Sequence, residues 1–494
     1  MVNRSITKQI SIFLLFIILG FGIYSNTLNV PFIFDDESRI LNNPNIRVTT
    51  FSDIGKAAFS KYSAQNRPFG NITFALNYYL HQYNLKGYHV VNIIIHVLTG
   101  IFFYLFIKTT LSVSTPQSVN PSTPESLDPS FIAFGAALAW LVHPVQTQSV
   151  TYIIQRMNSM AAMFFVLSFF LFLKGRLSSE NKKRWAWFAG SAVTWLLSLG
   201  CKQISATLPF FIFLYEWYFF QDLSKDWLRR HLKYLFGVAL LFGFISFLYL
   251  GLDPLEKILS LDAYARHKFT FTERVLTQFR VVVYYLSLLF YPHPSRLNLD
   301  YDFPLSHSLV DPITTLFSLG IIVMLLGSAF YLAKKERLIS FCILWFLGNL
   351  VIESTVIPLD IIYEHRVYLP SMLVFLLAAM LAGRYIRPKW LVSTALCTVV
   401  IICSVWTYER NAVWNNGIAF WQDCVEKSRN KARPHINLGN ELENRGEKTD
   451  AFRHYSKAVQ LDPENPKGHY NLGKNLATLG KRQEAVYHYS EAVR

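Results

Sequence analysis

The sequence predicts an all-α membrane protein, a polytopic helix bundle of about eleven transmembrane helices followed by a short helical repeat domain. Three observations lead to this fold class. Apolar runs of about 18 residues recur through residues 1–410, and each is long enough to cross a hydrocarbon core as a helix. Only 16% of the residues are charged, against about 25% in soluble domains. Residues 432–494 are polar and repeat with a fixed period.

The apolar runs set the order of the predicted helices. The first follows two basic residues and has no small-residue cleavage site, which predicts an uncleaved signal anchor with a cytoplasmic N-terminus. The runs lie at about residues 10–28, 88–108, 130–147, 155–173, 184–200, 203–220, 234–250, 312–333, 338–356, 367–385 and 389–407.

A twelfth stretch, residues 272–291, contains charged residues in its first half, so it either crosses the membrane or lies at the interface. Lys and Arg concentrate in the loops that the eleven-run order places in the cytoplasm. If residues 272–291 crossed fully, the basic clusters at 334–337 and 384–389 would move outside. The positive-inside rule therefore favours an interfacial segment, with residues 29–87, 251–311, 357–366 and the repeats outside and loop 109–129 inside.

Charge and cysteine content exclude two classes of protein. The net charge is +15, but the basic residues gather in short loops between apolar runs, which is typical of membrane topology and not of nucleic-acid binding. The five cysteines form no Cys-x-x-Cys pair and lie mostly in or beside apolar runs. The sequence therefore predicts neither a disulfide framework nor a zinc site.

Internal similarity defines the C-terminal domain. The segment His435–Gly439 returns as His469–Gly473, a shift of 34 residues, and small residues recur at the same spacing. A 34-residue helix–turn–helix period is typical of tetratricopeptide repeats. We expect about two repeats over residues 432–494, the second of them truncated at the last residue, with residues 411–431 as a linker.

The first external loop carries the strongest candidate for chemistry. Asp35, Asp36, Glu37 and Arg39 follow the first apolar run directly. Adjacent carboxylates repel one another, so one of them is expected to have a raised pKa suited to a general base. The alternative is a solvated cap for a loop helix, and the pattern alone does not separate the two.

Other polar residues at the external ends of the predicted helices are candidates for binding a phosphate or a sugar. Ionisable residues at membrane depth are costly and often functional, although helix capping or interhelical hydrogen bonding would also explain them. These residues are Arg67, His89, His143, Arg156, Lys202, Glu364 and Arg366. Asp300 and Asp302 lie in a further external segment, but no ligand spacing there requires a metal.

Read in order, these motifs resemble a known family. Asp35-Asp36 after the first crossing, Arg67-Pro68, Tyr88-His89, His143-Pro144 and Glu364-x-Arg366 are followed by tetratricopeptide repeats. The chain is thus similar to the transmembrane-and-tetratricopeptide O-mannosyltransferase-like proteins, within the lipid-phosphate-dependent C-type (GT-C) glycosyltransferases. The segment Asp36-Glu37-x-Arg39 also resembles a motif of related aminoarabinose transferases, which leaves both Asp35 and Asp36 as candidates for the base.

The resemblance implies a function. Residues 1–410 would form an inverting glycosyltransferase domain that moves a monosaccharide, mannose for this family, from a polyprenyl-phosphate donor to an acceptor hydroxyl, on protein Ser or Thr. Asp35 or Asp36 would be the base, no metal or other cofactor would be required, and the repeats would bind the acceptor polypeptide. The compact loops favour a bacterial inner membrane with a periplasmic site, and a eukaryotic chain would place it in the endoplasmic reticulum. The rival hypothesis is a non-catalytic membrane scaffold whose repeats recruit partner proteins.

Overall fold

The computed structural model describes residues 2–59, 67–114, 128–250, 264 and 267–494. Throughout these residues the chain forms helices joined by turns and loops, with no strand among them. The predicted all-α fold is confirmed. Parts of three predicted segments lie outside the described residues: the external segments 29–87 and 251–311 and the cytoplasmic loop 109–129.

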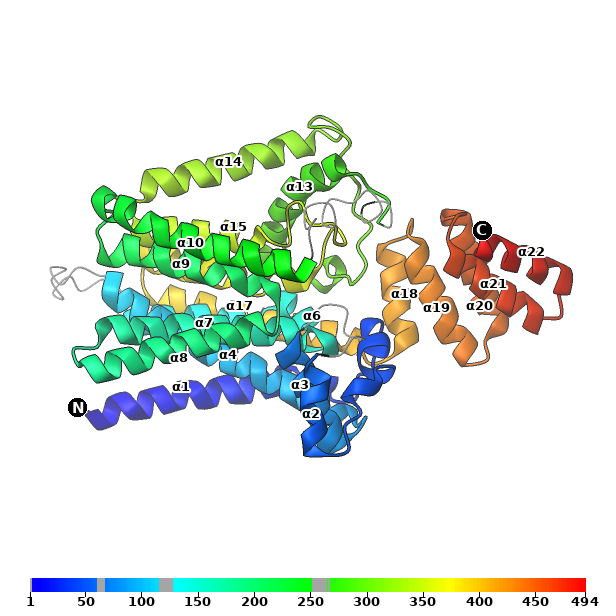
Figure 1. Cartoon of the computed structure of the whole chain (residues 1–494), viewed down its shortest axis with the longest axis horizontal. Coiled ribbons are helices and arrows are strands. Elements are labelled where there is room, and N and C mark those ends of the chain that lie inside the picture. Colours follow the sequence, from blue (N-terminus) through cyan, green and yellow to red (C-terminus); the bar gives the residue numbers. More distant parts are fainter. Residues whose placement is uncertain (1, 60–66, 115–127, 251–263, 265–266) are drawn as a thin grey trace.

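Each of the eleven predicted apolar runs coincides with a helix of the bundle (Figure 1). Among the residues that the structure describes, five helices are long and apolar enough to span a membrane, or six if the bent pair Pro129–Leu141 and Pro144–Val150 forms one span. The chain is therefore a membrane protein, and its number of crossings stays a prediction. The helices are α1 (Val2–Ile23), α4 (Leu85–Ser114), α5 (Pro129–Leu141), α7 (Arg156–Leu177), α8 (Asn181–Leu199), α9 (Leu208–Tyr215), α10 (Lys225–Leu250), α14 (Thr314–Leu332), α15 (Arg337–Leu350), α16 (Ser371–Tyr385) and α17 (Trp390–Val413).

Aromatic side chains fill the centre of this bundle. Trp345 of α15 is fully buried and contacts the rings of Phe106, Phe169 and Phe211 at centroid distances of 5.9, 5.9 and 5.1 Å. Aromatic pairs at such distances add to the free energy gained from apolar burial. Phenylalanine side chains thus pack between α4, α7, α9 and α15 and stabilise their association.

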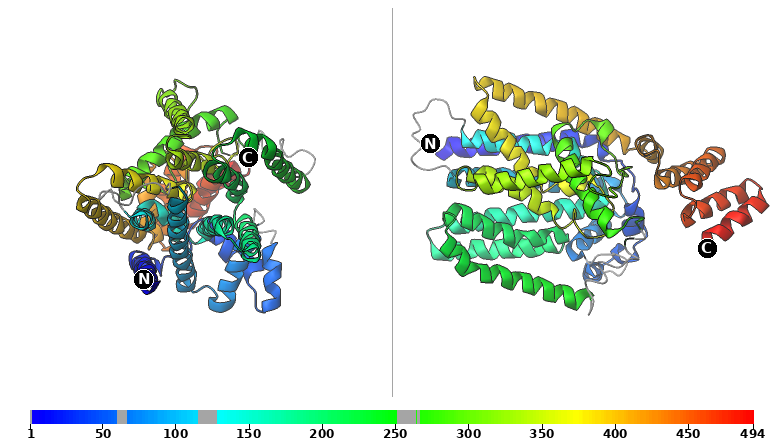
Figure 2. Two further views of the ribbon diagram at one scale, coloured as in Figure 1. Left: turned by 90° about the vertical axis from the view of Figure 1, so that its left-hand side faces the viewer. Right: turned by 90° about the horizontal axis from the view of Figure 1, so that it is seen from above.

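Loops and short helices collect at the end of the bundle opposite the N-terminus (Figures 1 and 2). The first loop, residues 29–87, contains the π-helical turn Glu37–Leu41, α2 (Ile54–Ala58) and α3 (Pro68–His81). The helix α6 (Thr147–Val150) and the 3₁₀ turn Glu364–Val367 lie in other connections. We refer to this end of the bundle as the loop end.

The ambiguous segment 272–291 is a single helix, α13 (Phe271–Phe290). Polar side chains of its charged half bind backbone groups of the protein. Arg274 is fully buried and donates to the backbone carbonyls of Glu353 and Leu359 at 2.9 and 2.5 Å. Gln278 donates to the carbonyl of Ile361 at 2.8 Å. These residues therefore fix the segment that follows α15 and do not face lipid.

Both ends of α13 lie at the loop end. Lys268, just before the helix, pairs with Asp462 of the repeat domain, and His293, just after it, contacts the ring of Trp406 near the end of α17. This placement is the one expected for a helix that does not cross the membrane.

The C-terminal domain consists of two helical hairpins related by the 34-residue shift, α19 (Ala432–Asn444) with α20 (Lys448–Leu461), and α21 (Pro466–Thr478) with α22 (Arg482–Val493). The recurring small residues are explained by close helix crossing. A Cβ atom at Gly439 would lie 2.5 Å from the ring of Tyr455, and one at Gly473 would lie 3.0 Å from Tyr489.

The predicted linker, residues 411–431, contains a further helix, α18 (Gly417–Lys427). Phe420, Trp421 and Cys424 are buried on one face of α18, which packs against α19. The spacing of these three residues places them on one helix face, in a segment that the sequence predicts as a linker.

The positions of the hairpin loops give a test of topology. The α7–α8 loop lies at the N-terminal end of the bundle and the repeats lie beyond the loop end (Figure 1). We expect cysteines introduced at the exposed positions Glu464 and Ser179, with exposed Cys397 replaced by Ser, to react from opposite sides of the membrane. The positive-inside rule predicts that only Glu464→Cys reacts with a membrane-impermeant maleimide on intact cells. Reaction of both positions from one side would contradict this arrangement.

Candidate functional site

A cavity of about 880 Å³ opens at the loop end of the bundle. Its wall is formed by the first loop, the start of α7, the turn after α8 and the segment 352–366. Charged side chains from the first loop, the turn after α8 and the segment 352–366 line it, with four cations against three carboxylates: Arg39, Arg67, Lys202 and Arg366, and Asp35, Glu353 and Asp360. The cavity is thus lined by many charged side chains, with a small excess of cations.

The two adjacent aspartates of the first loop have different surroundings. Asp35 lines the cavity, whereas Asp36 is 1% exposed and points away from it. The Asp36 carboxylate accepts hydrogen bonds from the backbone N–H groups of Ile33 at 3.2 Å and Ile154 at 2.8 Å. Asp36 therefore ties the start of the first loop to the segment that leads into α7.

The backbone turns sharply at this point. Phe34 has φ = 56°, in the left-handed region that residues other than glycine rarely adopt. The N–H of Asp35 donates to the hydroxyl of Tyr152 at 2.9 Å. Burial raises the pKa of Asp35, and nearby Arg39 opposes that shift. Burial raises the pKa of Asp36 well above its usual value, against the lowering effect of its two backbone hydrogen bonds.

Lys202 and Glu353 form an ion pair in the cavity wall, with Nζ to Oε1 at 2.8 Å and side chains only 6% and 11% exposed. Lys202 also donates to Oδ1 of Asn158 at 2.9 Å. Burial lowers the pKa of Lys202 to about 8, although Glu353 opposes the shift. Burial likewise lowers the pKa of Arg67 to about 10. Both cations would gain from a further anion in the cavity.

His365 and Arg366 come from the 3₁₀ turn that follows Tyr363. The backbone N–H of His365 donates to Oε1 of Gln148 at 2.8 Å, and its ring Nδ1 lies 3.1 Å from the same oxygen. Burial lowers the pKa of His365 well below its usual value, with Lys202 and Arg366 acting in the same direction. The imidazole is therefore neutral at pH 7. Arg366 donates to the carbonyl of Ile361 at 3.1 Å.

The structure thus brings together five of the predicted site residues, Asp35, Arg39, Arg67, Lys202 and Arg366. They come from three separate parts of the sequence, the first loop, the turn after α8 and the segment 352–366, and the shared cavity is the arrangement expected if they bind one phosphate-bearing ligand. Their functional roles stay predictions.

The other predicted site residues do not line the cavity. Asp36 is buried beside it and Glu37 is exposed. The ring Nε2 of His89 lies 2.9 Å from the carbonyl of Val30, and that of His143 lies 3.2 Å from the carbonyl of Leu289. The fully buried Arg156 donates to Oδ1 of Asn92 at 2.7 Å and to the carbonyl of Tyr88 at 2.9 Å.

Glu364 is also directed away from the cavity. Its Oε1 accepts hydrogen bonds from the N–H of Asn298 and the hydroxyl of Tyr301, both at 2.6 Å. The prediction that Glu364, His89, His143 and Arg156 bind substrate therefore finds no support in this geometry. The physical reason is that polar groups inside an apolar bundle require partners, and here other helices and loops provide them.

The sequence reasoning missed several cavity residues. Glu353 is the only charged residue in the apolar run 338–356, and the rule that ionisable residues within apolar runs are often functional would have identified it. Asp360 and His365 carry no such signal, because they lie in an external loop where charge is ordinary. Among the residues that the structure describes, no group of three His, Cys, Asp or Glu side chains is placed to hold a metal ion. The expectation that no cofactor is required stays a prediction.

Comparison with known proteins gives one consistent family. A family model described as TPR repeat matches residues 439–480, inside the predicted repeats. The chain is 26% identical over 89% of its length to protein O-mannosyl-transferase F38B6.6 of Caenorhabditis elegans, 25% identical over 90% to protein O-mannosyl-transferase Tmtc3 of Drosophila melanogaster, and 23% identical over 90% to protein O-mannosyl-transferase TMTC3 of Homo sapiens.

These alignments cover 61%, 54% and 50% of the three relatives, so the chain spans little more than half the length of the proteins that it matches. No solved structure matches the chain. The relatives confirm the resemblance that the order of the motifs predicted.

The buried ion pair gives a prediction about stability. Glu353 has three cationic neighbours, Lys202, Arg366 and Arg67, so Glu353→Gln would leave buried positive charge without compensation. We expect Glu353→Gln to lower the free energy of unfolding by about 3–5 kcal/mol, and more than Lys202→Met does. The measurement is thermal unfolding in detergent, monitored as the loss of the monodisperse peak in size-exclusion chromatography.

A matched control is Lys183→Met, which removes an exposed ion pair with Glu180 whose side chains are 69% and 54% exposed. We expect it to cost less than about 1 kcal/mol. Equal effects of Glu353→Gln and Lys183→Met would show that the buried pair has no special role in stability.

Proposed function

We propose that this chain, a homologue of the protein O-mannosyl-transferases, transfers a monosaccharide from a polyprenyl-phosphate donor to a hydroxyl group of a protein acceptor. The sugar proposed is mannose, as the names of the relatives suggest, and the acceptor residue is Ser or Thr, as the family resemblance implies. The observation that carries the proposal is the presence of one carboxylate, Asp35, in the same cavity as four cationic side chains.

The charges of the cavity suit a sugar phosphate. A phosphodiester that links a lipid to a sugar carries negative charge, which increases on the phosphate as the sugar leaves. Arg39, Arg67, Lys202 and Arg366 offer positive charge from four different elements. Guanidinium groups bind phosphate oxygens with two parallel hydrogen bonds, which would also orient the donor.

The proposed reaction is a single displacement. The acceptor oxygen attacks the anomeric carbon, the bond from that carbon to the phosphate oxygen breaks, and the hydroxyl proton passes to the carboxylate of Asp35. The lipid phosphate leaves with the bonding electron pair, and the configuration at the anomeric carbon inverts. Asp36 does not contact the reactants in this scheme, because both its oxygens accept hydrogen bonds from backbone N–H groups.

The repeat domain would present the acceptor. It lies beside the loop end, where the cavity opens, so a polypeptide bound by α19–α22 would be close to Asp35 (Figure 1). We propose an external site, periplasmic in a bacterial inner membrane or lumenal in the endoplasmic reticulum, since the cationic loops favour a cytoplasmic N-terminus.

A non-catalytic scaffold is the rival hypothesis, and it predicts that the acidic pair is dispensable for any activity. Buried charge from several elements around a cavity favours the enzyme, because the charges of a scaffold have no reason to converge. Sugar transfer that depends on Asp35 would decide between them.

The two aspartates should respond differently to loss of charge. We expect Asp35→Asn to lower the rate of transfer from polyprenyl-phosphate mannose by about 100- to 10,000-fold, as is typical for loss of a general base. Asp36→Asn should mainly destabilise the protein, since the amide can accept only one of the two backbone hydrogen bonds. The measurements are transfer in liposomes and thermal unfolding of each variant.

The control is Asp226→Asn, at an exposed position near the start of α10, which should leave both quantities unchanged. Wild-type transfer by the Asp35→Asn variant would remove Asp35 as the base and return the question to Asp36.

The pH dependence gives a second test of Asp35. Arg39 is the cation that most favours its ionised form, so Arg39→Gln should raise the pKa of Asp35. The base acts as a carboxylate, and activity is lost as the pH falls through that pKa. We therefore expect the acidic limb of the pH–rate profile, measured at saturating donor, to move to higher pH. Arg230→Gln, at an exposed position in α10, should leave the acidic limb at the wild-type pH. A shift to lower pH in the Arg39 variant would contradict the assignment.

A further inference from the structure

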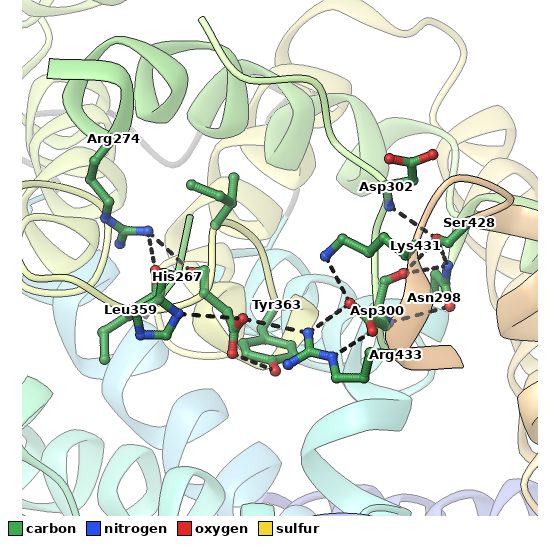
Figure 3. A network of polar contacts seen from close by, with 12 residues as sticks. His267, Arg274, Asn298, Asp300, Asp302, Leu359, Tyr363, Ser428, Lys431 and Arg433 are labelled. Atoms are coloured by element: carbon green, nitrogen blue, oxygen red, sulfur yellow. Dashed lines mark hydrogen bonds and ion pairs between the residues drawn. The ribbon is translucent and has the colours of Figure 1, made fainter. Parts of the chain in front are cut away.

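The first helix of the repeat domain is joined to the loop end by a charged contact. Arg433 of α19 makes a two-pronged ion pair with Asp300, with Nε to Oδ2 at 2.6 Å and Nη2 to Oδ1 at 2.7 Å (Figure 3). Asp300 is only 3% exposed, and it also accepts from Lys431 at 2.9 Å. The contact therefore links two segments that are more than a hundred residues apart through a buried carboxylate.

The same guanidinium reaches the wall of the cavity. Nη2 of Arg433 lies 3.4 Å from Oδ1 of Asp360, a cavity residue. The other oxygen of Asp360 accepts from the hydroxyl of Tyr363 at 2.9 Å, and Tyr363 immediately precedes the turn that carries His365 and Arg366. Figure 3 shows Arg433 between Tyr363 and Asp300.

Arg433 also holds the residue that precedes the proposed base. Its guanidinium carbon lies 5.6 Å from the centre of the Phe34 ring, on which Trp421 of α18 packs at 5.8 Å in an edge-to-face contact. Phe34 is the residue with φ = 56°, and this backbone conformation sets the direction of the next side chain, Asp35. A sterically disfavoured conformation persists only where its surroundings fix it. Here the fixing groups come from the C-terminal helices.

We propose that Arg433 is a positioning residue, which holds the Phe34 turn and Asp360 so that Asp35 faces the cavity. The C-terminal helices α18 and α19 are in this view a structural part of the transfer site, in addition to any contact of the repeats with the acceptor. This inference rests on the proposed function for its catalytic consequence, and on the contacts of Arg433 alone for its structural one.

The charges around Asp35 make the role of Arg433 measurable. The groups that face Asp35 are Asp36, Arg39 and Arg67 from the first loop, Tyr152 before α7, Asp360 and Tyr363 from the cavity wall, and Arg433 from α19. Arg433 favours the ionised form of Asp35 directly, and it also offsets the negative charge of Asp360, which opposes that form. Removing its positive charge therefore favours the protonated form of Asp35 in both ways. The acidic limb of the pH–rate profile should then move to higher pH.

The experiment compares Arg433→Met, Arg433→Lys and the control Arg230→Met in the full chain. Arg230 is exposed in α10 and donates to the backbone carbonyl of Asp226 at 3.2 Å. The first readout is hydrogen–deuterium exchange of residues 32–41 and 357–363, which requires no activity. The second is the pH–rate profile of transfer at saturating donor.

We expect Arg433→Met to increase exchange in both segments, to lower kcat by about 10- to 100-fold, as a misplaced catalytic group does, and to shift the acidic limb upward. Arg433→Lys keeps the charge but not the two-pronged contact. The acidic limb of its pH–rate profile should therefore stay at the wild-type pH, while kcat falls. Arg230→Met should match the wild type in both readouts.

The two proposals fail in different ways. Unchanged exchange in both segments of Arg433→Met would overturn the positioning role, whatever the activity. Unchanged kcat and pH profile, in a wild type that transfers mannose, would also overturn it. Increased exchange with no detectable transfer by the wild type would support the structural coupling and overturn the proposed function.

Discussion

The two hydrogen bonds that Asp36 accepts from the N–H groups of Ile33 and Ile154 are the contact on which the rest of the loop end depends. They fix the start of a long loop against the first turn of α7. Asp36 is directed inward, and its neighbour Asp35 lines the cavity. A buried carboxylate is costly unless its oxygens are satisfied, so the clamp persists only while the backbone of residues 33–36 keeps its sharp turn.

The same requirement explains most of the polar residues inside the bundle. Arg156, His89 and His143 contact carbonyls and amides of neighbouring segments, and Arg274 holds the loop after α15 in the same manner. Backbone that is not helical has unpaired carbonyl groups, and near an apolar bundle these must be paired within the protein. The irregular segments at the loop end are therefore possible because buried cations bind their carbonyls.

The sequence was sufficient for the parts of the structure that depend on periodicity. Hydropathy predicted the apolar helices and a 34-residue shift predicted the repeat hairpins, because these features are local. It also identified five cavity residues: Lys202 and Arg366 lie next to the ends of apolar runs, and Asp35, Arg39 and Arg67 lie in the first external loop. The sequence was not sufficient where the role of a polar residue depends on the partner that it contacts. Glu364 and Arg366 are two positions apart, yet one binds Tyr301 and the other lines the cavity. The pairing of Asp300 with Arg433 likewise depends on tertiary contacts that no local pattern encodes.

The cavity holds its cations ready for an anion without leaving them unpaired. Lys202 is bonded to Glu353 and Asn158, and burial lowers its pKa to about 8, close to neutrality. A phosphate that binds nearby adds negative charge and favours the protonated lysine, which raises that pKa again. Binding of the proposed donor would then be linked to the uptake of a proton at pH values near or above 8. Glu353, whose cationic neighbours are Lys202, Arg366 and Arg67, would compete with the donor phosphate for the same side chains.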